Sequence, residues 1–144
     1  MAKESVFSDS EKAAMKARAK EAREFKKLSG VEQIRIKLNE LSQQEQDLAW
    51  AVHDLVMSTA PELEPRTWYG MPAYYLNGKV ICFFQPAGQY KVRYATFGFQ
   101  EAANLDDGGF WPTGYALTEL NEKTRNQIAG LVKKAVRPHP PAQG

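Results

Sequence analysis

The fold of this chain is decided by the stretch WYGMPAYYLNGKVICFF, which covers residues 68–84. Asn77-Gly78 separates two β-prone runs within it. This dipeptide between such runs is the strongest short-range signal for a β-hairpin, because both turn positions need a positive φ. A two-residue turn also sets the register of the two strands. The expected pairs are Leu76 with Lys79, Tyr75 with Val80, Tyr74 with Ile81 and Ala73 with Cys82.

Further segments extend the predicted sheet on both sides of this hairpin. The run from Arg66 to Tyr69 is β-prone, and Gly70 to Pro72 is expected to interrupt it. Apolar residues on both faces of 80–84 predict an interior strand. The alternation from Tyr90 to Thr96 predicts another strand, and 113–117 predicts a short last one. The sheet should therefore have about five strands.

Helices are predicted before and after these strands. Ser8 and Ser42 each stand three residues before a glutamate, which is the capping-box spacing, so a helix should begin at each. The second of these helices should end at Ala60-Pro61 and carry the apolar stripe of the core. Residues 31–41 fit both a strand and a short helix, and their charges favour the helix. A final helix is expected to stop at Arg137-Pro138.

This order of elements predicts an α+β fold in which helices pack on an antiparallel sheet. The chain should divide into a basic helical extension at 1–30, one α+β domain at 31–137 and a flexible tail at 138–144. The extension holds eight Lys/Arg and five Asp/Glu, a net charge of +3, whereas the whole chain has a net charge of only +2. Its apolar face is thin, so it is expected to be peripheral.

Two interpretations of the basic extension stay open. It could be an arm for an acidic partner, or a solvated helix held by close pairs such as Lys20 with Glu24, and the second is favoured because charged helix faces are usually just solvated. The small overall charge disfavours nucleic acid as a partner, and the chain has no apolar run of membrane-spanning length. The lone Cys82 fits a reducing compartment, and a cytoplasmic location is the default.

No catalytic constellation is visible in the sequence, so enzymatic activity is not expected. The two histidines, His53 and His139, stand far apart, and no spacing of His and Cys resembles a zinc site. No Ser or Cys lies in a nucleophile-elbow context, and no glycine-rich loop suits a phosphate.

Aromatic and basic residues in the strand-rich half provide the best candidate site. Arginine beside aromatic rings can hold an anion, a carboxylate or a stacked ring, although aromatic residues on strands are more often core residues. The predicted ligand-binding residues are Trp68, Tyr69, Arg93, Tyr94 and Trp111. The ligand would be a small anionic or aromatic molecule or a protein partner, and a homodimer is compatible with the sequence.

Several short motifs also resemble the YdhG-like family of domains of unknown function. The most specific is Trp68-Tyr69-Gly70-Met71-Pro72-Ala73-Tyr74, supported by Pro61-Glu62-Leu63, Gly78-Lys79-Val80, Arg93-Tyr94, Gly98-Phe99, Leu105-Asp106-Asp107-Gly108 and Trp111-Pro112. The resemblance covers about residues 31–136 and implies a frataxin-like, helix-flanked antiparallel sheet. Some relatives are described as iron chaperones.

The resemblance adds iron binding as an alternative function. No cofactor is evident in the sequence itself, but hard cations prefer carboxylate oxygens. Iron would then be held among Glu45, Asp47, Asp54, Asp106 and Asp107, with Glu62 and Glu64 as weaker candidates. A nucleic-acid accessory protein that uses the basic extension is the third alternative, behind the ligand-binding module and the iron chaperone.

Overall fold

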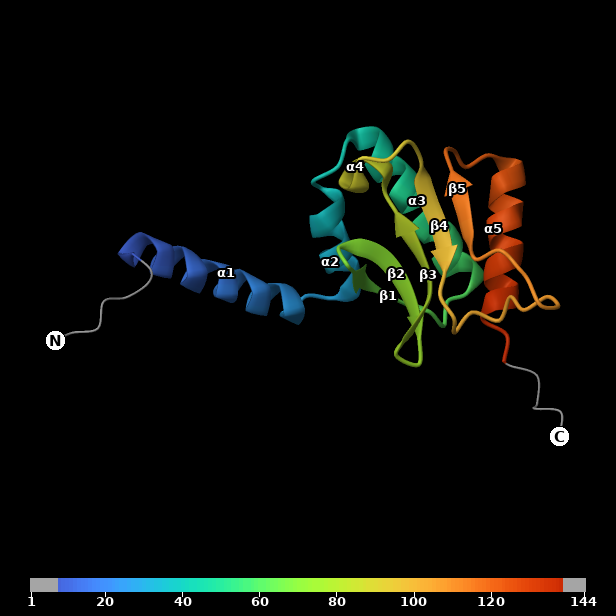
Figure 1. The fold of residues 1–144 in the computed structure, drawn as a ribbon, viewed down its shortest axis with the longest axis horizontal. Coiled ribbons are helices and arrows are strands. Elements are labelled where there is room, and N and C mark those ends of the chain that lie inside the picture. Colours follow the sequence, from blue (N-terminus) through green and yellow to red (C-terminus); the bar gives the residue numbers. More distant parts are fainter. Residues whose placement is uncertain (1–7, 139–144) are drawn as a thin grey trace.

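The computed structural model describes residues 8–138 and shows an α+β fold (Figure 1). Within these residues the helices are α1 (Asp9–Lys27), α2 (Gly30–Leu38), α3 (Gln43–Thr59), the one-turn α4 (Ala87–Tyr90) and α5 (Glu122–Ala135). The strands are β1 (Glu64–Trp68), β2 (Met71–Leu76), β3 (Lys79–Gln85), β4 (Ala95–Phe99) and β5 (Gly114–Leu117). They form one open antiparallel sheet in the order β1-β2-β3-β4-β5. The predicted fold class and strand number are confirmed.

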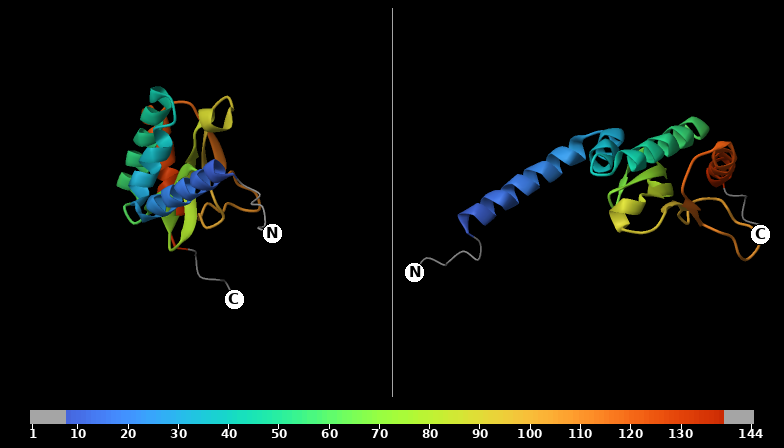
Figure 2. Two further views of the ribbon diagram at one scale, coloured as in Figure 1. Left: turned by 90° about the vertical axis from the view of Figure 1, so that its left-hand side faces the viewer. Right: turned by 90° about the horizontal axis from the view of Figure 1, so that it is seen from above.

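The core lies between one face of this sheet and three helices. The view from above in Figure 2 shows α2, α3 and α5 on the same side of the sheet. Tyr74, Phe84 and Phe97 project from the strands into this layer and are fully buried. Val52 on α3 and Val132 on α5 meet them from the helix side. The opposite face of the sheet carries no such helix layer in the described structure, and we call it the open face.

The helix starts follow the predicted serines. The Oγ atoms of Ser8 and Ser42 accept hydrogen bonds from the backbone N–H groups of Glu11 and Glu45, at 3.1 and 3.3 Å. Ser29 caps α2 in the same way, which settles residues 31–41 as largely helical. On α3 the buried residues are Ala49, Val52, Leu55 and Val56, while Leu48 and Thr59, which share their helical spacing, are only half-buried.

The expected interruption is confirmed at Gly70, where a second tight hairpin turns, but it is wrong for Met71 and Pro72, which already belong to β2. Tyr69 and Gly70 both have positive φ, 51° and 74°, and Trp68 pairs directly with Met71. In such a turn the flanking pair exchanges hydrogen bonds, so the next pair, Thr67 with Pro72, does not. The missing N–H of Pro72 therefore points away from β1, and the pairing of β2 with β3 begins only at Ala73.

The predicted register of the Asn77-Gly78 hairpin agrees with the structure only for the two residue pairs next to the turn. Leu76 pairs with Lys79 and Tyr75 with Val80, as predicted, but a β-bulge follows. Tyr74 therefore faces Cys82 and Ala73 faces Phe83, one residue further along than expected. The bulge leaves Ile81 as the extra residue on β3, and it brings Tyr74 and Cys82 to the helix side, where both are completely buried.

The predicted strand from Tyr90 to Thr96 is also wrong for most of its length. Lys91 has a left-handed backbone (φ 53°, ψ 43°), and the N–H of Val92 donates to the C=O of Ala87, which closes the turn of α4. Strand β4 begins only at Ala95 and continues through the Phe97-Gly98-Phe99 segment. The alternation of aromatic and basic residues thus resembles a strand in a segment that folds back as a turn.

The long helix α1 projects from the rest of the molecule (Figure 1). No residue of α1 is buried. None of the helices within residues 8–138 has both the length and the apolar character needed to span a bilayer. The predicted tail, apart from residue 138, and the first seven residues lie outside the described residues.

Candidate functional site

The five residues predicted to form one pocket lie in three places. Arg93 and Tyr94 line a cavity of about 240 Å³ beside the start of α3, and the Arg93 guanidinium lies 5.0 Å from the centre of the Tyr94 ring. Trp111 lines a different cavity of about 530 Å³, together with residues of the loop before β5. Trp68 and Tyr69 line neither of these two cavities. The structure therefore does not bring the five residues into one site.

Trp68 packs against other aromatic side chains on the open face of the sheet. Its ring centre lies 5.2 Å from that of Phe83 and 5.0 Å from that of Tyr69. Phe83 in turn lies so closely over Gly98 that a Cβ there would be 2.4 Å from the Phe83 ring. This arrangement is an aromatic cross-strand cluster, the role that aromatic residues on strands most often have.

The predicted metal ligands are likewise distributed over several elements. Glu45 accepts a hydrogen bond of 2.7 Å from the backbone N–H of Gly88, so it fastens α4 to α3 instead of completing a capping box. Asp47 accepts from the Gln43 amide at 2.7 Å, and Glu64 pairs with Arg66 at 2.6 Å. Within residues 8–138 no three carboxylate, His or Cys side chains come close enough together to hold a metal ion.

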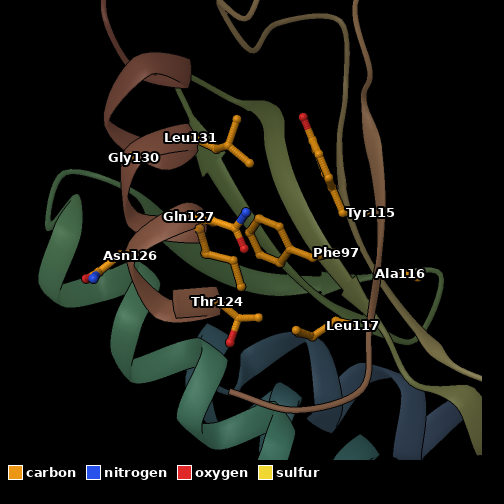
Figure 3. A pocket seen from close by; sticks show the side chains of 10 residues that line it. Phe97, Tyr115, Ala116, Leu117, Thr124, Asn126, Gln127, Gly130 and Leu131 are labelled. Atoms are coloured by element: carbon orange, nitrogen blue, oxygen red, sulfur yellow. The ribbon is translucent and has the colours of Figure 1, made fainter. Parts of the chain in front are cut away.

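A groove between α5 and β5 involves none of the predicted site residues. It encloses about 480 Å³, within the range of small-molecule sites in proteins. Figure 3 shows Phe97 and Tyr115 on the strand side, with Gln127 and Leu131 facing them from α5. Its other lining residues are Ala116, Leu117, Thr124, Asn126, Ile128 and Gly130. The groove is therefore mainly apolar, with a hydroxyl and amides at its helix side.

Gly130 lies at the outer rim of this groove, at an exposed position of α5. It lies inside α5, where a glycine costs roughly 0.5–1 kcal/mol relative to alanine. A Cβ at this position would have nothing within 4 Å, so no neighbouring group in the described structure requires glycine there. With 3.6 residues per turn, Gly130 lies nearly opposite the buried Ile128, so the open space beside it faces outward.

The strand side of the groove presents unpaired backbone groups. The N–H of Phe99 donates to the C=O of Thr113 at 2.7 Å, which fixes the hydrogen-bonding phase between β4 and β5. By the alternation of an antiparallel ladder, Tyr115 and Leu117 then bond to β4, while the N–H and C=O of Ala116 point away. Ala116 lines the groove, so these groups can bond a ligand there.

Sequence reasoning missed this groove because its residues look like ordinary core and surface positions. Phe97, Ile128 and Leu131 fit a buried pattern, and β5 is a short edge strand.

The half-buried His53 meets the buried Tyr74 at the edge of the core. His53 Nδ1 lies 3.1 Å from the Tyr74 hydroxyl. Burial lowers the pKa of His53, and the Asp54 carboxylate opposes this shift only in part. Burial also raises the pKa of Tyr74 well above its usual value and that of the Cys82 thiol. These groups are therefore neutral at pH 7, and Cys82 is an inert core residue.

Comparison of the chain with protein-family models, with curated proteins and with solved structures found no match. The resemblance to the YdhG-like family therefore stays a prediction. The candidate function rests on the described fold and on the α5–β5 groove.

Proposed function

We infer that this protein is a ligand-binding module whose site is the groove between α5 and β5. The observation that carries this inference is the groove itself, a mainly apolar space of about 480 Å³ beside an edge strand whose Ala116 backbone groups are free to bond a ligand. Small-molecule sites in proteins combine a mainly apolar lining with a few polar groups, and the lining of this groove has that composition.

The lining indicates a small ligand that is mainly apolar and aromatic and carries one polar end. Tyr115 offers a flat apolar surface opposite Leu131, and aromatic rings pack well in offset or edge-to-face contact. The Gln127 amide can donate to a carboxylate or carbonyl on the ligand, and the free N–H of Ala116 can do the same from the strand side. This agrees with the small anionic or aromatic ligand expected from the sequence, but at a different place.

This binding role needs no catalytic group, because the groove residues supply only shape and hydrogen bonds. A cytoplasmic location and membership of the YdhG-like family fit the proposal and are inferences of the same kind. Iron binding receives less support, since the candidate carboxylates are engaged with Gly88, Gln43 and Arg66 or stand apart within residues 8–138.

The proposal is tested by titrating the full chain with naphthalene-2-carboxylate while recording amide nuclear magnetic resonance spectra. For a probe of this size we expect a Kd on the order of 1 mM. The amide signals of Ala116, Gly130 and Leu131 should shift together with the same Kd. Shifts confined to other parts of the protein would contradict the proposal.

Two substitutions in α5 provide the matched comparison. Gln127→Trp places a large ring in the groove and should weaken naphthoate binding at least about tenfold, because the probe and the new side chain compete for one space. Lys133→Trp adds the same side chain at an exposed position of α5 outside the groove lining and should leave the Kd unchanged. Equal binding by both variants would show that the probe occupies another site.

A further inference from the structure

Five basic side chains form a continuous row along α1. Lys12, Lys16, Lys20, Arg23 and Lys27 follow one another at spacings of four, four, three and four residues. With 3.6 residues per turn these positions fall within an arc of about 80° and extend over about 22 Å. We call them the basic row. Apart from Asp9 in the first turn, the acidic residues of α1 lie outside this arc.

The basic row has no structural task within the described residues. No residue of α1 is buried, and the ion pairs found in residues 8–138 lie on α2 and β1 rather than on α1. In particular, Lys20 and Glu24 do not form the close pair predicted from the sequence. The cations of the row are therefore available to a partner.

The end of α1 next to the domain is held by a few specific contacts. The Gln33 amide donates to the C=O of Phe25 at 3.1 Å and accepts from the Thr67 hydroxyl at 3.3 Å, so it links α1 to β1 through α2. The Lys37 ammonium lies 5.5 Å from the centre of the Phe25 ring. The rest of α1 extends away from the domain (Figures 1 and 2), so its whole length is accessible.

From this arrangement we propose that α1 binds the phosphate backbone of double-stranded DNA through the basic row. Duplex DNA carries about one negative charge per 1.7 Å of its axis, so a row of about 22 Å meets several phosphates at once. The major groove is about 12 Å wide and admits an α-helix, and α1 is slender because five alanines occupy its other sides. A narrow single row suits one phosphate-lined wall of that groove.

The composition of α1 favours DNA over a membrane surface. Helices that lie in a membrane interface need a broad apolar face of large side chains. Away from the basic row, Met15 and Phe25 are the only large apolar residues of α1, and Arg18 and Glu21 lie among them. Lysine predominates in the row, and it contacts phosphate as a point charge, so the binding should not depend on the DNA sequence.

The test is fluorescence anisotropy of a labelled 20-base-pair DNA duplex titrated with the full chain between 25 and 200 mM NaCl. At about 100 mM salt we expect a Kd of roughly 10⁻⁶–10⁻⁴ M, with log K falling against log salt at a slope of about −4. The variant K12Q/K16Q/K20Q/R23Q/K27Q should lose at least about 50-fold in affinity at low salt and most of this slope. Glutamine is a good helix former, and circular dichroism checks that α1 persists.

Two control variants distinguish the effect of the basic row from the effect of net charge alone. K79Q/K91Q/R93Q/K123Q/R125Q removes five exposed cations from the domain and should bind DNA within about twofold of the unaltered chain, since it has the same net charge as the row variant. K16A/A17K/K20E/E21K keeps the composition and net charge but moves two cations out of the row, and it should weaken binding about tenfold. Equal losses in the row and domain variants would overturn the proposal, as would an unaffected permuted variant.

Other anionic probes are measured in the same experiment for comparison with duplex DNA. Phosphatidylcholine vesicles with 30% phosphatidylglycerol and polyglutamate should both bind α1 more weakly than duplex DNA at equal salt. Duplex RNA should also bind more weakly, because its deep and narrow major groove does not admit side chains or a helix. Tighter binding to any of these three probes would overturn the assignment to DNA.

Discussion

At the residue scale, the most recognisable motif of this chain is explained by the backbone. Tyr69 and Gly70 form the turn, Met71 closes it, and Pro72 lies where β2 needs no N–H toward β1. The C=O of Tyr69 accepts hydrogen bonds from the Tyr90 hydroxyl and the Gln89 amide, at 3.1 and 3.5 Å, which ties the turn to α4. Such a motif can therefore be a folding signature without being a ligand site.

Two facing glycines in the sheet have opposite requirements. Gly98 is buried beneath Phe83, so a Cβ there would force the ring to move against Trp68, whereas Gly114, its direct partner on β5, has open space. We expect Gly98→Ala to lower the free energy of unfolding by about 1–3 kcal/mol through overpacking. Gly114→Ala should change it by less than about 0.5 kcal/mol. Urea unfolding measures both, and equal effects would show that Phe83 does not constrain β4.

His53 makes the stability of the fold depend on pH. Burial lowers its pKa below the ordinary value of 6.5, so the folded state binds this proton less readily than the unfolded state. The stability gained from keeping His53 neutral is complete above the pKa that His53 has in the unfolded state. It is lost as the pH falls from about 6.5 toward the lower pKa that His53 has in the folded state. We expect the unfolding free energy to fall in this window, with a slope of at most about 1.4 kcal/mol per pH unit.

Urea unfolding between pH 8 and 5 measures this effect of His53. His53→Gln retains an acceptor for the Tyr74 hydroxyl but does not titrate, so its stability should vary less across the window. An identical pH profile for the variant and the unaltered chain would assign the dependence to other groups.

At the element scale, Gly30 permits the close contact between α2 and β1. A Cβ on this first residue of α2 would lie 1.8 Å from the backbone C=O oxygen of Pro65. A backbone atom cannot turn aside as a side chain can, so Gly30→Ala should cost about 2–3 kcal/mol and separate the two elements. Gly130→Ala, also in a helix but with open space, should instead gain about 0.5–1 kcal/mol. Thermal and urea unfolding of the two variants test these opposite signs.

The elements that could be predicted from the sequence are those with a local signal. Ser8 and Ser42 fix helix starts through their own side chains, and Asn77-Gly78 fixes a turn through φ alone. The Tyr69-Gly70 hairpin was missed because tyrosine seldom adopts positive φ. The β-bulge at Ile81 depends on how β3 pairs with β2, so no local sequence pattern indicates it.

The candidate site was less predictable than the fold, because it depends on which elements become neighbours. Arg93 and Trp111 were both predicted to line one ligand site. The turn at Lys91 places Arg93 in one cavity, however, and the loop before β5 places Trp111 in another. The α5–β5 groove joins segments whose meeting requires the completed sheet. The basic row, in contrast, is set by helical spacing alone and could have been read from the sequence.

At the scale of the whole molecule, the domain and its arm should be separable. All the buried residues lie in the part of the chain after α1, and the contacts of α1 are concentrated at Phe25 and Leu28. Deleting residues 1–28 should therefore change the unfolding free energy by less than about 1 kcal/mol. The urea m value should stay nearly unchanged, because α1 buries little surface in the folded protein and its loss changes little of the surface that unfolding exposes.

The same deletion tests whether α1 forms from its own sequence. Alanine, lysine, arginine and glutamate favour the helix, Ser8 caps its start, and the Asp9 and Glu11 side chains there and Lys26 and Lys27 at its end match the helix dipole. A free helix of this length is still only marginally stable in water. We therefore expect the amide protons of α1 to exchange much faster than those of α3 in the full chain, while helical circular dichroism falls on deletion. Protection of α1 equal to that of α3, or a loss of several kcal/mol on deletion, would show instead that the arm is part of the cooperative fold.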